Sequence, residues 1–406
     1  YPDVGSVGTF TYADGTTRSL SKAASLKVWM EGGSFTDSAG NKTTFEAYGK
    51  NPFTGQQVIY VTPVSSTEFN NNPDIIWNYK VTMFGTWDSN GNNDTQPNSK
   101  ALQVIEQYIK AGYGVVAGHD TVGTNYGAKN IGLSKLRKYF NIEIGTQGAT
   151  VTSESDIDYN ATWVYYSSNV IVVNGGLITS FPYEIPKNAN LTVPLTHTCS
   201  NAALGTVWME FTEPYTNNTI VNYTGTGNPK YFLTTYNNTA MVQTGHSNCN
   251  STEDERKVLA NVLFYMDQRT NGTSFTANSA TDTKAPDKPV KGTVALNGTN
   301  KINVSYNSSK DNGSTYSFYI DAYNKLDPNT VIARSNEVTK TVTTGLKGYY
   351  YVIDNNATNN FNVNNATFTT ATTLTFNLTD NGKYLHVKSV DNAGNASSVT
   401  DIQLDV

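Results

Sequence analysis

The fold is decided by residues 114–120, Gly114-Val115-Val116-Ala117-Gly118-His119-Asp120. This stretch begins with a short apolar run, which predicts a buried strand, and it ends in a small polar turn. Just before it, residues 99–111 carry apolar side chains on one broad face and are followed by Gly112, which predicts a helix with a glycine cap. An earlier apolar run, Lys80-Val81-Thr82-Met83-Phe84, predicts another strand. Strand, helix and strand at this spacing indicate a βαβ unit and hence a parallel sheet.

A second group of strands and a helix follows further along the chain. Residues 231–236 and 239–244 predict two adjacent strands, and Gly245-His246 follows the second. The next helix is predicted by a capping box, Thr252-x-x-Glu255, and by an apolar stripe that continues to about Gln268. We therefore expect residues 56–270 to form one α/β domain.

The segments outside this domain have a different composition. Residues 1–55 are polar, and their short alternating stretches, such as Lys27-Val28-Trp29-Met30, predict short strands or hairpins. Residues 271–288 have no apolar period and indicate a linker. Residues 289–406 consist of short alternating runs with many turn residues, which predict an all-β sandwich of the immunoglobulin type.

The overall composition points to an extracellular protein. The chain of 406 residues has only 15% charged residues and a net charge of -5, and its polar surface is built from Asn, Thr, Ser and Tyr. There is no cluster of Lys and Arg, so we expect no nucleic-acid partner, and no apolar run is long enough to span a bilayer. Because the chain begins with Tyr1 and not Met, we expect a processed piece of a longer precursor.

The two cysteines and the glycosylation sequons are consistent with that location. Cys199 and Cys249 each follow a histidine at a predicted strand end, so they are either a disulfide pair or two unrelated thiols. Numerous Asn-x-Ser/Thr sequons would allow the protein to be a glycoprotein, although a chain this rich in Asn, Thr and Ser also produces sequons by chance.

Two groups of motifs resemble known families. The strand ends Gly118-His119-Asp120 and Gly245-His246 resemble the ThuA-like branch of the flavodoxin-like, class I glutamine-amidotransferase-like fold, in which a Gly-His ends both strands. Ala285-Pro286-Asp287-Lys288-Pro289 and residues 387–395 resemble the immunoglobulin-like modules of large bacterial surface proteins. The pairing of both is similar to a family of bacterial and trichomonad surface proteins. The resemblance implies a fold but no settled reaction. Since His119 stands where the amidotransferases have their nucleophilic cysteine, we do not expect a glutaminase.

Three of the four histidines follow predicted strands: His119, His197 and His246. If these strands are parallel, their carboxyl ends share the edge at which open α/β sheets bind ligands. The histidines could then hold a divalent metal ion, or His119 and His246 could act as catalytic bases with Asp120 as a partner. His197, Trp87 and Asp88 are the further candidate binding residues. The alternative is that the histidines only hydrogen-bond loops and the acids cap turns. We expect His386, in the sandwich, to face solvent.

Two hypotheses of function remain open. The first is a cell-surface structural protein, without catalysis, that works in adhesion or in the assembly of a surface structure, with a carbohydrate, another surface ligand or copies of itself as partner. The second is a secreted ThuA-like carbohydrate-active enzyme that uses the histidines, with or without a metal ion. Convergence of the three histidines, with an open pocket and a bound ion, would favour the second hypothesis. Divergent or plugged histidines would favour the first.

Overall fold

The computed structural model describes the chain in several segments that form two compact units. The described residues are 8–18, 23–52, 54–85, 96–119, 121–123, 132–145, 162–164, 166–198, 200–212, 219–221, 224–244, 246, 249, 251–270, 282–324 and 327–406. Unit 1 comprises Tyr1–Asn278 and Ser317–Val338, and unit 2 comprises Ser279–Tyr316 and Thr339–Val406. Unit 1 combines sheets with helices, and the described part of unit 2 is built from strands with two short 3-10 turns, η4 (Val363–Asn365) and η5 (Leu378–Asp380).

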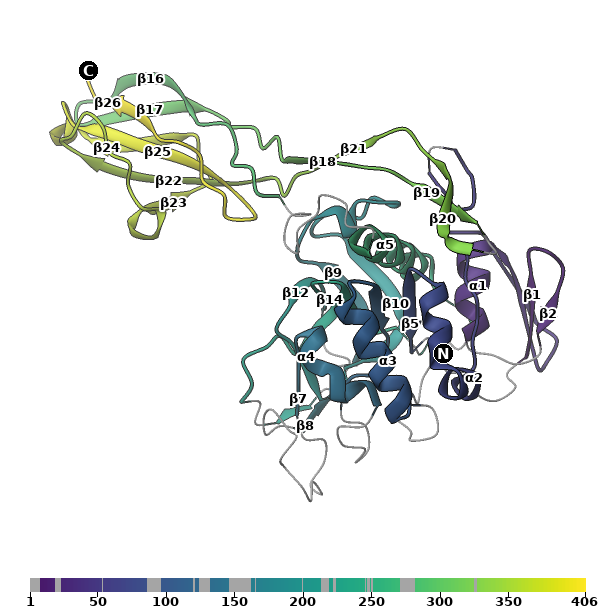
Figure 1. Cartoon of the computed structure of the whole chain (residues 1–406). Coiled ribbons are helices and arrows are strands. Elements are labelled where there is room, and N and C mark those ends of the chain that lie inside the picture. Colours follow the sequence, from purple (N-terminus) through teal and green to yellow (C-terminus); the bar gives the residue numbers. More distant parts are fainter. Residues whose placement is uncertain are drawn as a thin grey trace. The chain divides into compact units, whose positions relative to one another are not determined.

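The centre of unit 1 is a seven-stranded mixed sheet (Figure 1) with the strand order β10-β9-β12-β14-β15-β6-β5. Its strands are β5 (Val81–Phe84), β6 (Gly114–Ala117), β9 (Tyr166–Val172), β10 (Asn190–His197), β12 (Thr206–Phe211), β14 (Tyr231–Tyr236) and β15 (Thr239–Val242). Only β5, β6 and β15 pair in parallel, and every other neighbouring pair is antiparallel. The expected flavodoxin-like parallel sheet is therefore not confirmed, because the sheet is mixed and parallel pairing is limited to three of its strands.

The antiparallel part of the sheet begins at a tight hairpin. Tyr236 pairs with Thr239, so Asn237 and Asn238 alone connect β14 to β15, and Asn237 has a positive φ of 50°. A two-residue connection can join only antiparallel strands, and asparagine tolerates the left-handed conformation that such turns require. The short connection between residues 236 and 239 is visible in the sequence, and it is the physical reason why a parallel sheet cannot extend beyond β15.

Helices cover both faces of the parallel strands (Figure 1). Helix α3 (Ser99–Lys110) begins at its N-cap Asn98, and its buried side chains share a hydrophobic core with Val115 and Ala117 of β6. Because neighbouring residues of a strand point to opposite faces, the buried Val116 lies on the other face, with Gly114. A Cβ on Gly114 would lie 3.0 Å from the Cβ of Met266 in α5 (Glu253–Thr270), so α5 packs on that second face.

The N-terminal part of unit 1 is a small antiparallel sheet with a helix. The sheet has the order β2-β1-β3-β4 and consists of β1 (Gly8–Tyr12), β2 (Thr17–Arg18), β3 (Gly33–Asp37) and β4 (Lys42–Phe45). The expected strand around Lys27-Val28-Trp29-Met30 is wrong, because these residues belong to helix α1 (Ala23–Glu31). Val28, Trp29 and Met30 are all buried, which an alternating strand with one exposed face could not achieve.

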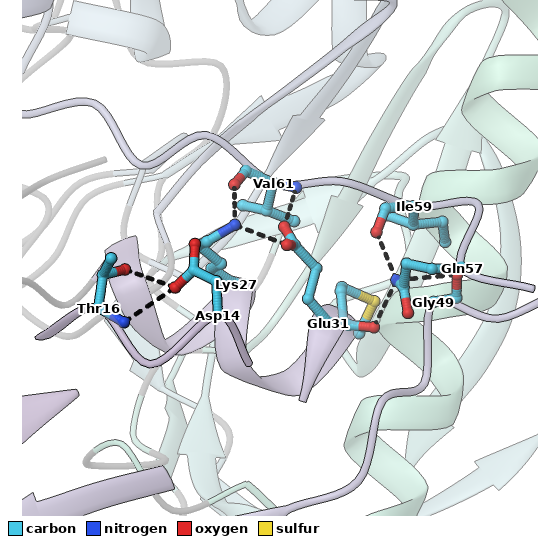
Figure 2. Close-up of polar contacts among 9 residues, drawn as sticks. Asp14, Thr16, Lys27, Glu31, Gly49, Gln57, Ile59 and Val61 are labelled. Atoms are coloured by element: carbon cyan, nitrogen blue, oxygen red, sulfur yellow. Dashed lines mark hydrogen bonds and ion pairs between the residues drawn. The ribbon is translucent and has the colours of Figure 1, made fainter. Parts of the chain in front are cut away.

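The apolar run Val58-Ile59-Tyr60-Val61 forms no strand in the structure, although its composition would suit one. The Val58 and Ile59 amides both donate to the Gly49 carbonyl oxygen at 2.9 Å, and side chains bind the Ile59 carbonyl oxygen and the backbone of Val61, as Figure 2 shows. The side-chain nitrogen of Gln57, Nε2, donates to the carbonyl oxygens of Met30, Gly49 and Ile59, at 2.9, 3.1 and 2.7 Å. The Val61 amide donates to the Glu31 carboxylate at 2.7 Å, and the same carboxylate accepts from Lys27 at 2.6 Å.

Shorter elements complete unit 1. They are α2 (Ser66–Asn71), η1 (Pro73–Asn78), η2 (Gly132–Leu136), α4 (Arg137–Phe140), β7 (Ile142–Ile144), β8 (Thr162–Val164), η3 (Leu177–Thr179), β11 (Asn201–Ala203) and β13 (Thr219–Val221). β7 pairs with β11, and β8 pairs with β13. Among the helices in the described ranges, none is both long and apolar enough to cross a membrane.

The core of unit 2 lies between two antiparallel sheets, which gives the expected all-β architecture. One sheet has β16 (Val290–Asn297), β17 (Lys301–Asn307) and β24 (Thr373–Asn377), and the other has β22 (Leu346–Asp354), β23 (Thr367–Thr369), β25 (Tyr384–Asp391) and β26 (Thr400–Gln403). The prediction that His386 faces solvent is wrong. The residue is fully buried, with Nδ1 2.5 Å from the Asp401 carboxylate and Nε2 3.1 Å from the Asp354 carboxylate.

One part of the predicted C-terminal module belongs to unit 1. Residues 317–338 contain β19 (Asp321–Asn324) and β20 (Asp327–Arg334), between the strands β18 (Ser314–Phe318) and β21 (Val338–Val342). Phe318 is 1% exposed, and its ring centroid lies 4.8 Å from that of Phe181 and 5.4 Å from that of Phe264 in α5. The two units therefore divide the chain differently from the boundaries expected on composition, 271–288 and 289–406.

Candidate metal centre

Three strands that run in the same direction carry the three histidines of unit 1. β15 and β6 are parallel neighbours, and the alternating pairings from β15 to β10 give β10 that direction too. His197 is the last residue of β10, while His119 and His246 lie just beyond the ends of β6 and β15. The carboxyl edge of the sheet thus holds all three, as expected, although antiparallel strands separate β10 from β15.

The three imidazole rings are in direct contact. Their centroids are separated by 4.3 Å for His119 and His197, 4.6 Å for His119 and His246, and 4.8 Å for His197 and His246, with interplanar angles of 83°, 77° and 80°. One ring nitrogen from each histidine lies within 4.8 Å of the other two. We call these three residues the histidine cluster.

Backbone carbonyl groups determine the tautomers of two of the rings. His119 Nδ1 lies 3.1 Å from the His197 carbonyl oxygen, and His197 Nδ1 lies 3.1 Å from the Thr198 carbonyl oxygen. A carbonyl oxygen only accepts, so both Nδ1 atoms carry the proton, and in the neutral ring both Nε2 atoms keep a lone pair. His246 Nε2 lies 2.9 Å from His119 Nε2, and it donates to that lone pair.

The backbone around Gly118 explains why His119 is preceded by glycine. The Gly118 amide donates to the Phe84 carbonyl oxygen at 2.6 Å, and a Cβ on Gly118 would lie 1.8 Å from the Gly85 carbonyl oxygen. Any side chain at this position would push the two strand ends apart. The His119 amide in turn donates to the Thr244 carbonyl oxygen at 2.9 Å, which holds the end of β6 against the end of β15.

A bulge in β10 precedes His197. Thr192 pairs with Asn169 and Thr196 pairs with Ser167, so four residue steps on β10 face two steps on β9. Pro194 lies inside this interval, where a residue without an amide donor costs no ladder hydrogen bond. The ladder resumes at Thr196 and His197, so the irregularity lies between the body of the strand and its histidine.

Buried amide side chains connect the segments that carry the histidines. Asn201 Nδ2 donates to the Val122 carbonyl oxygen at 2.5 Å, and Gln243 Nε2 lies 3.5 Å from Asn201 Oδ1. Both side chains are fully buried. Gln243 Oε1 has no hydrogen-bond partner among the described residues. These contacts join the regions that follow His119 and His197 to the strand end that precedes His246.

A buried carboxyl group joins β15 to α5. Glu255 accepts from the hydroxyl groups of Thr244 and Ser251, the latter at 2.7 Å, and burial raises the pKa of its carboxyl group. The Glu255 amide donates to Thr252 Oγ1 at 3.2 Å, so one half of the predicted capping box is present. The Glu255 side chain itself bridges the two ends of the loop that carries His246.

Several predicted site residues cannot be placed. Asp120, Trp87 and Asp88 lie outside the described residues, and their proposed roles stay predictions. Cys199 also lies outside them, so its disulfide with Cys249 stays a prediction; Cys249 is buried with a φ of 68°. Conversely, Asn201 and Gln243 were not foreseen. Their only signal in the sequence is a polar side chain beside a predicted strand end, which is common in loops.

Comparison with known proteins adds no family to this description. Searches against protein-family models, curated proteins and solved structures find no match to the chain.

Proposed function

We propose that unit 1 binds one divalent transition-metal cation at the histidine cluster, and that zinc is the cation best suited to it. The observation that supports this proposal is the convergence of one ring nitrogen from each of His119, His197 and His246. Neutral imidazole is a ligand for zinc, copper, nickel and iron, whereas magnesium and calcium prefer oxygen ligands.

The distance between the ring nitrogens of His119 and His246 is close to the distance between two neighbouring ligand atoms of a zinc ion. With zinc–nitrogen bonds of about 2.0–2.1 Å, two ligands at a tetrahedral angle lie roughly 3.3 Å apart. The Nε2 atoms of His119 and His246 are 2.9 Å apart, so a cation requires only a small separation of the rings. The carbonyl groups that accept from the Nδ1 atoms are the outer partners that metal-binding histidines commonly have, since they fix the proton on Nδ1 and the lone pair on Nε2.

The ligand set favours an enzyme over a purely structural site. Structural zinc sites usually have four protein ligands, while catalytic sites have three and leave a position for water or substrate. Three histidines form the cluster among the described residues. A metal ion there would lower the pKa of a bound water molecule and so supply a nucleophile for hydrolysis. Together with the ThuA-like motifs, this supports a secreted, metal-dependent carbohydrate-active enzyme.

The burial of the cluster favours a second candidate function. His119 is 0% and His197 is 4% exposed, and only His246 is half-buried, so a large substrate has little access to the first two rings. A cluster of this kind could instead stabilise the carboxyl edge of the sheet. The protein would then be an extracellular surface protein for adhesion or assembly, and unit 2 would act as its spacer or docking module.

Metal analysis of the full-length chain tests the proposal. After incubation with zinc and extensive dialysis, we expect about one zinc per chain by elemental analysis, and calorimetry should show saturable binding. His119→Ala removes one of three ligands and should weaken zinc binding by at least about tenfold, which is the effect of even an outer-partner mutation at such sites.

The fourth histidine provides the matched control. His386→Gln removes an imidazole that lies in unit 2 and should leave zinc binding unchanged. Circular dichroism establishes that both variants are folded. Equal zinc binding by the wild type and His119→Ala would contradict the proposal. If zinc binds, hydrolysis of a panel of acetylated and glycosidic chromogenic substrates that stops on chelation would support the enzyme, whereas zinc-dependent stability without turnover would support the structural role.

A further inference from the structure

The charge of the proposed metal centre indicates what else it binds. His119 and His197 present neutral Nε2 lone pairs, because their protons reside on Nδ1 against carbonyl oxygens. His246 can coordinate through Nε2 only after its proton moves from that atom, which again leaves a neutral ring. Three neutral ligands leave a divalent cation with its whole charge of about +2.

That charge would lie in a poorly solvated place. His119 is 0% and His197 is 4% exposed, so two sides of the cation would be shielded from water. Burying a charge in such surroundings is costly, and an opposite charge beside it lowers that cost. Within the described ranges, the ligand atoms that converge in the histidine cluster are three ring nitrogens and no carboxylate oxygen. A separate group of converging carboxylates, Asp282, Asp311 and Asp391, belongs to unit 2.

The described carboxyl group that borders the cluster is already engaged. Glu255 accepts hydrogen bonds from Thr244 and Ser251 and lies behind the strand end of β15. Thr244 uses its carbonyl oxygen for the His119 amide, so Glu255 acts on the cluster through the backbone and not as a ligand. Neutralisation of the cation therefore has to come from outside this set of residues.

We propose that the open coordination position of the metal centre takes a small anion with a single negative charge, such as hydroxide, azide or a short carboxylate. This proposal rests on the metal binding proposed above. His246 is half-buried and gives solvent its access to the cluster, whereas the burial of the other two histidines restricts the size of the ligand. The open coordination position thus selects small anions over neutral sugars. A carbohydrate substrate would occupy it with an acidic or acylated group.

Cobalt and azide provide a direct test. Cobalt(II) replaces zinc in histidine sites and reports its coordination in the visible spectrum. We expect addition of azide to the cobalt-loaded full-length protein to change the spectrum saturably, at one azide per cobalt. Perchlorate at equal ionic strength coordinates metals weakly and should cause no change.

The outcomes separate this proposal from the one on which it rests. Failure of the wild type to bind cobalt or zinc overturns both. Cobalt binding without any response to azide overturns the anion site alone. Asp120 follows His119 in the sequence, so Asp120→Asn is tested in parallel: an azide response seen only in this variant would make Asp120 the native counter-charge and would also overturn the anion site. Equal responses in both proteins support it.

Discussion

At position 118 the backbone leaves no room for a side chain, because a Cβ would lie 1.8 Å from the Gly85 carbonyl oxygen. The same segment is fixed by the bond from the Gly118 amide to Phe84 and by the bond from the His119 amide to Thr244. The position of the His119 ring is therefore set by backbone contacts on both sides of it. Gly118 contributes to the site without touching a ligand, by allowing the ends of β5 and β6 to approach.

Gly118→Ala is accordingly expected to affect both stability and metal binding. An added methyl group in a tightly packed place costs about 1–3 kcal/mol of unfolding free energy. It should also displace His119 and weaken zinc binding several-fold. Denaturant unfolding and zinc calorimetry measure the two effects separately.

The control is Gly298→Ala, in unit 2. Gly298 has a positive φ of 68°, and a Cβ added there would meet no atom within 4 Å, so alanine strains the backbone without a clash. It should destabilise unit 2 and leave zinc binding as in the wild type. Unchanged zinc binding in Gly118→Ala would show that the strand ends can separate without moving His119.

Residue-level features were predictable where they follow from local sequence. Each histidine of the cluster follows an apolar run within a few residues, so its place near a strand end could be inferred before the fold was known. The environment of His386 could not. Its two carboxylate partners, Asp354 and Asp401, lie 32 and 15 residues away, and only the pairing of β22 and β26 with β25 brings them together.

At the scale of elements, the positions of the strands were more predictable than their directions. An apolar run such as Val115-Val116-Ala117 indicates a buried strand whichever way its neighbours run. Direction depends on the connections, and the short turn at Asn237 and Asn238 makes β14 antiparallel to β15. Helix α1 was missed for a different reason, since its apolar residues Val28, Trp29 and Met30 are consecutive and show no helical period.

The contact between β15 and α5 through Glu255 gives a prediction about pH. Burial raises the pKa of this carboxyl group above its ordinary value of 4.5, so the folded state holds a proton that the unfolded chain releases. Stability should therefore fall as the pH rises from about 4.5 towards the folded-state pKa. Glu255→Gln keeps hydrogen-bonding capacity without a titrating group, and it should make the stability of unit 1 less dependent on pH.

Urea unfolding at pH 5 and pH 8 measures this effect. All five tryptophans lie in unit 1, so tryptophan fluorescence follows that unit alone. Glu253→Gln is the matched control on the same helix. A hydrogen bond from Lys257 lowers the pKa of the Glu253 carboxyl group. The contribution of Glu253 to stability is therefore lost only as the pH falls below about 4.5. An identical pH dependence in Glu255→Gln and the wild type would mean that Glu255 is ionised in the folded protein.

At the scale of the whole molecule, the two units are not consecutive pieces of chain. Unit 1 includes residues 317–338, which lie in the middle of the region that composition assigns to the sandwich. The composition of residues 271–288 gave a sound reason to expect a linker there. It carried no information on residues 317–338, because the aromatic and alternating pattern around Phe318 fits a sandwich strand equally well.

Phe318 tests whether this returning segment is required by unit 1. The side chain is buried against Phe181 and Phe264. Phe318→Ala should therefore lower the free energy of unfolding by about 3–5 kcal/mol, as for other buried phenylalanines. This loss of stability should appear when the unfolding of unit 1 is followed by tryptophan fluorescence. A chain that ends at residue 278 should be destabilised at least as much, because it lacks the whole segment.

The exposed Phe368, in unit 2, provides the comparison. It is 42% exposed, and Phe368→Ala should change the unfolding of unit 1 by less than about 0.5 kcal/mol. A chain ending at residue 278 that unfolds at the same temperature as the full-length protein would show that residues 317–338 contribute nothing to unit 1.

The return of residues 317–338 to unit 1 has a consequence for synthesis. A ribosome releases the chain from its N-terminus, and domains made of continuous sequence fold as they emerge. Here Phe181 and Phe264 precede Phe318 in the chain and emerge before it, so the apolar surface that Phe318 covers stays exposed until residues 279–317 have been added and Phe318 has emerged. During that interval the nascent chain is a target for chaperones, and slower translation across this region would lengthen its exposure.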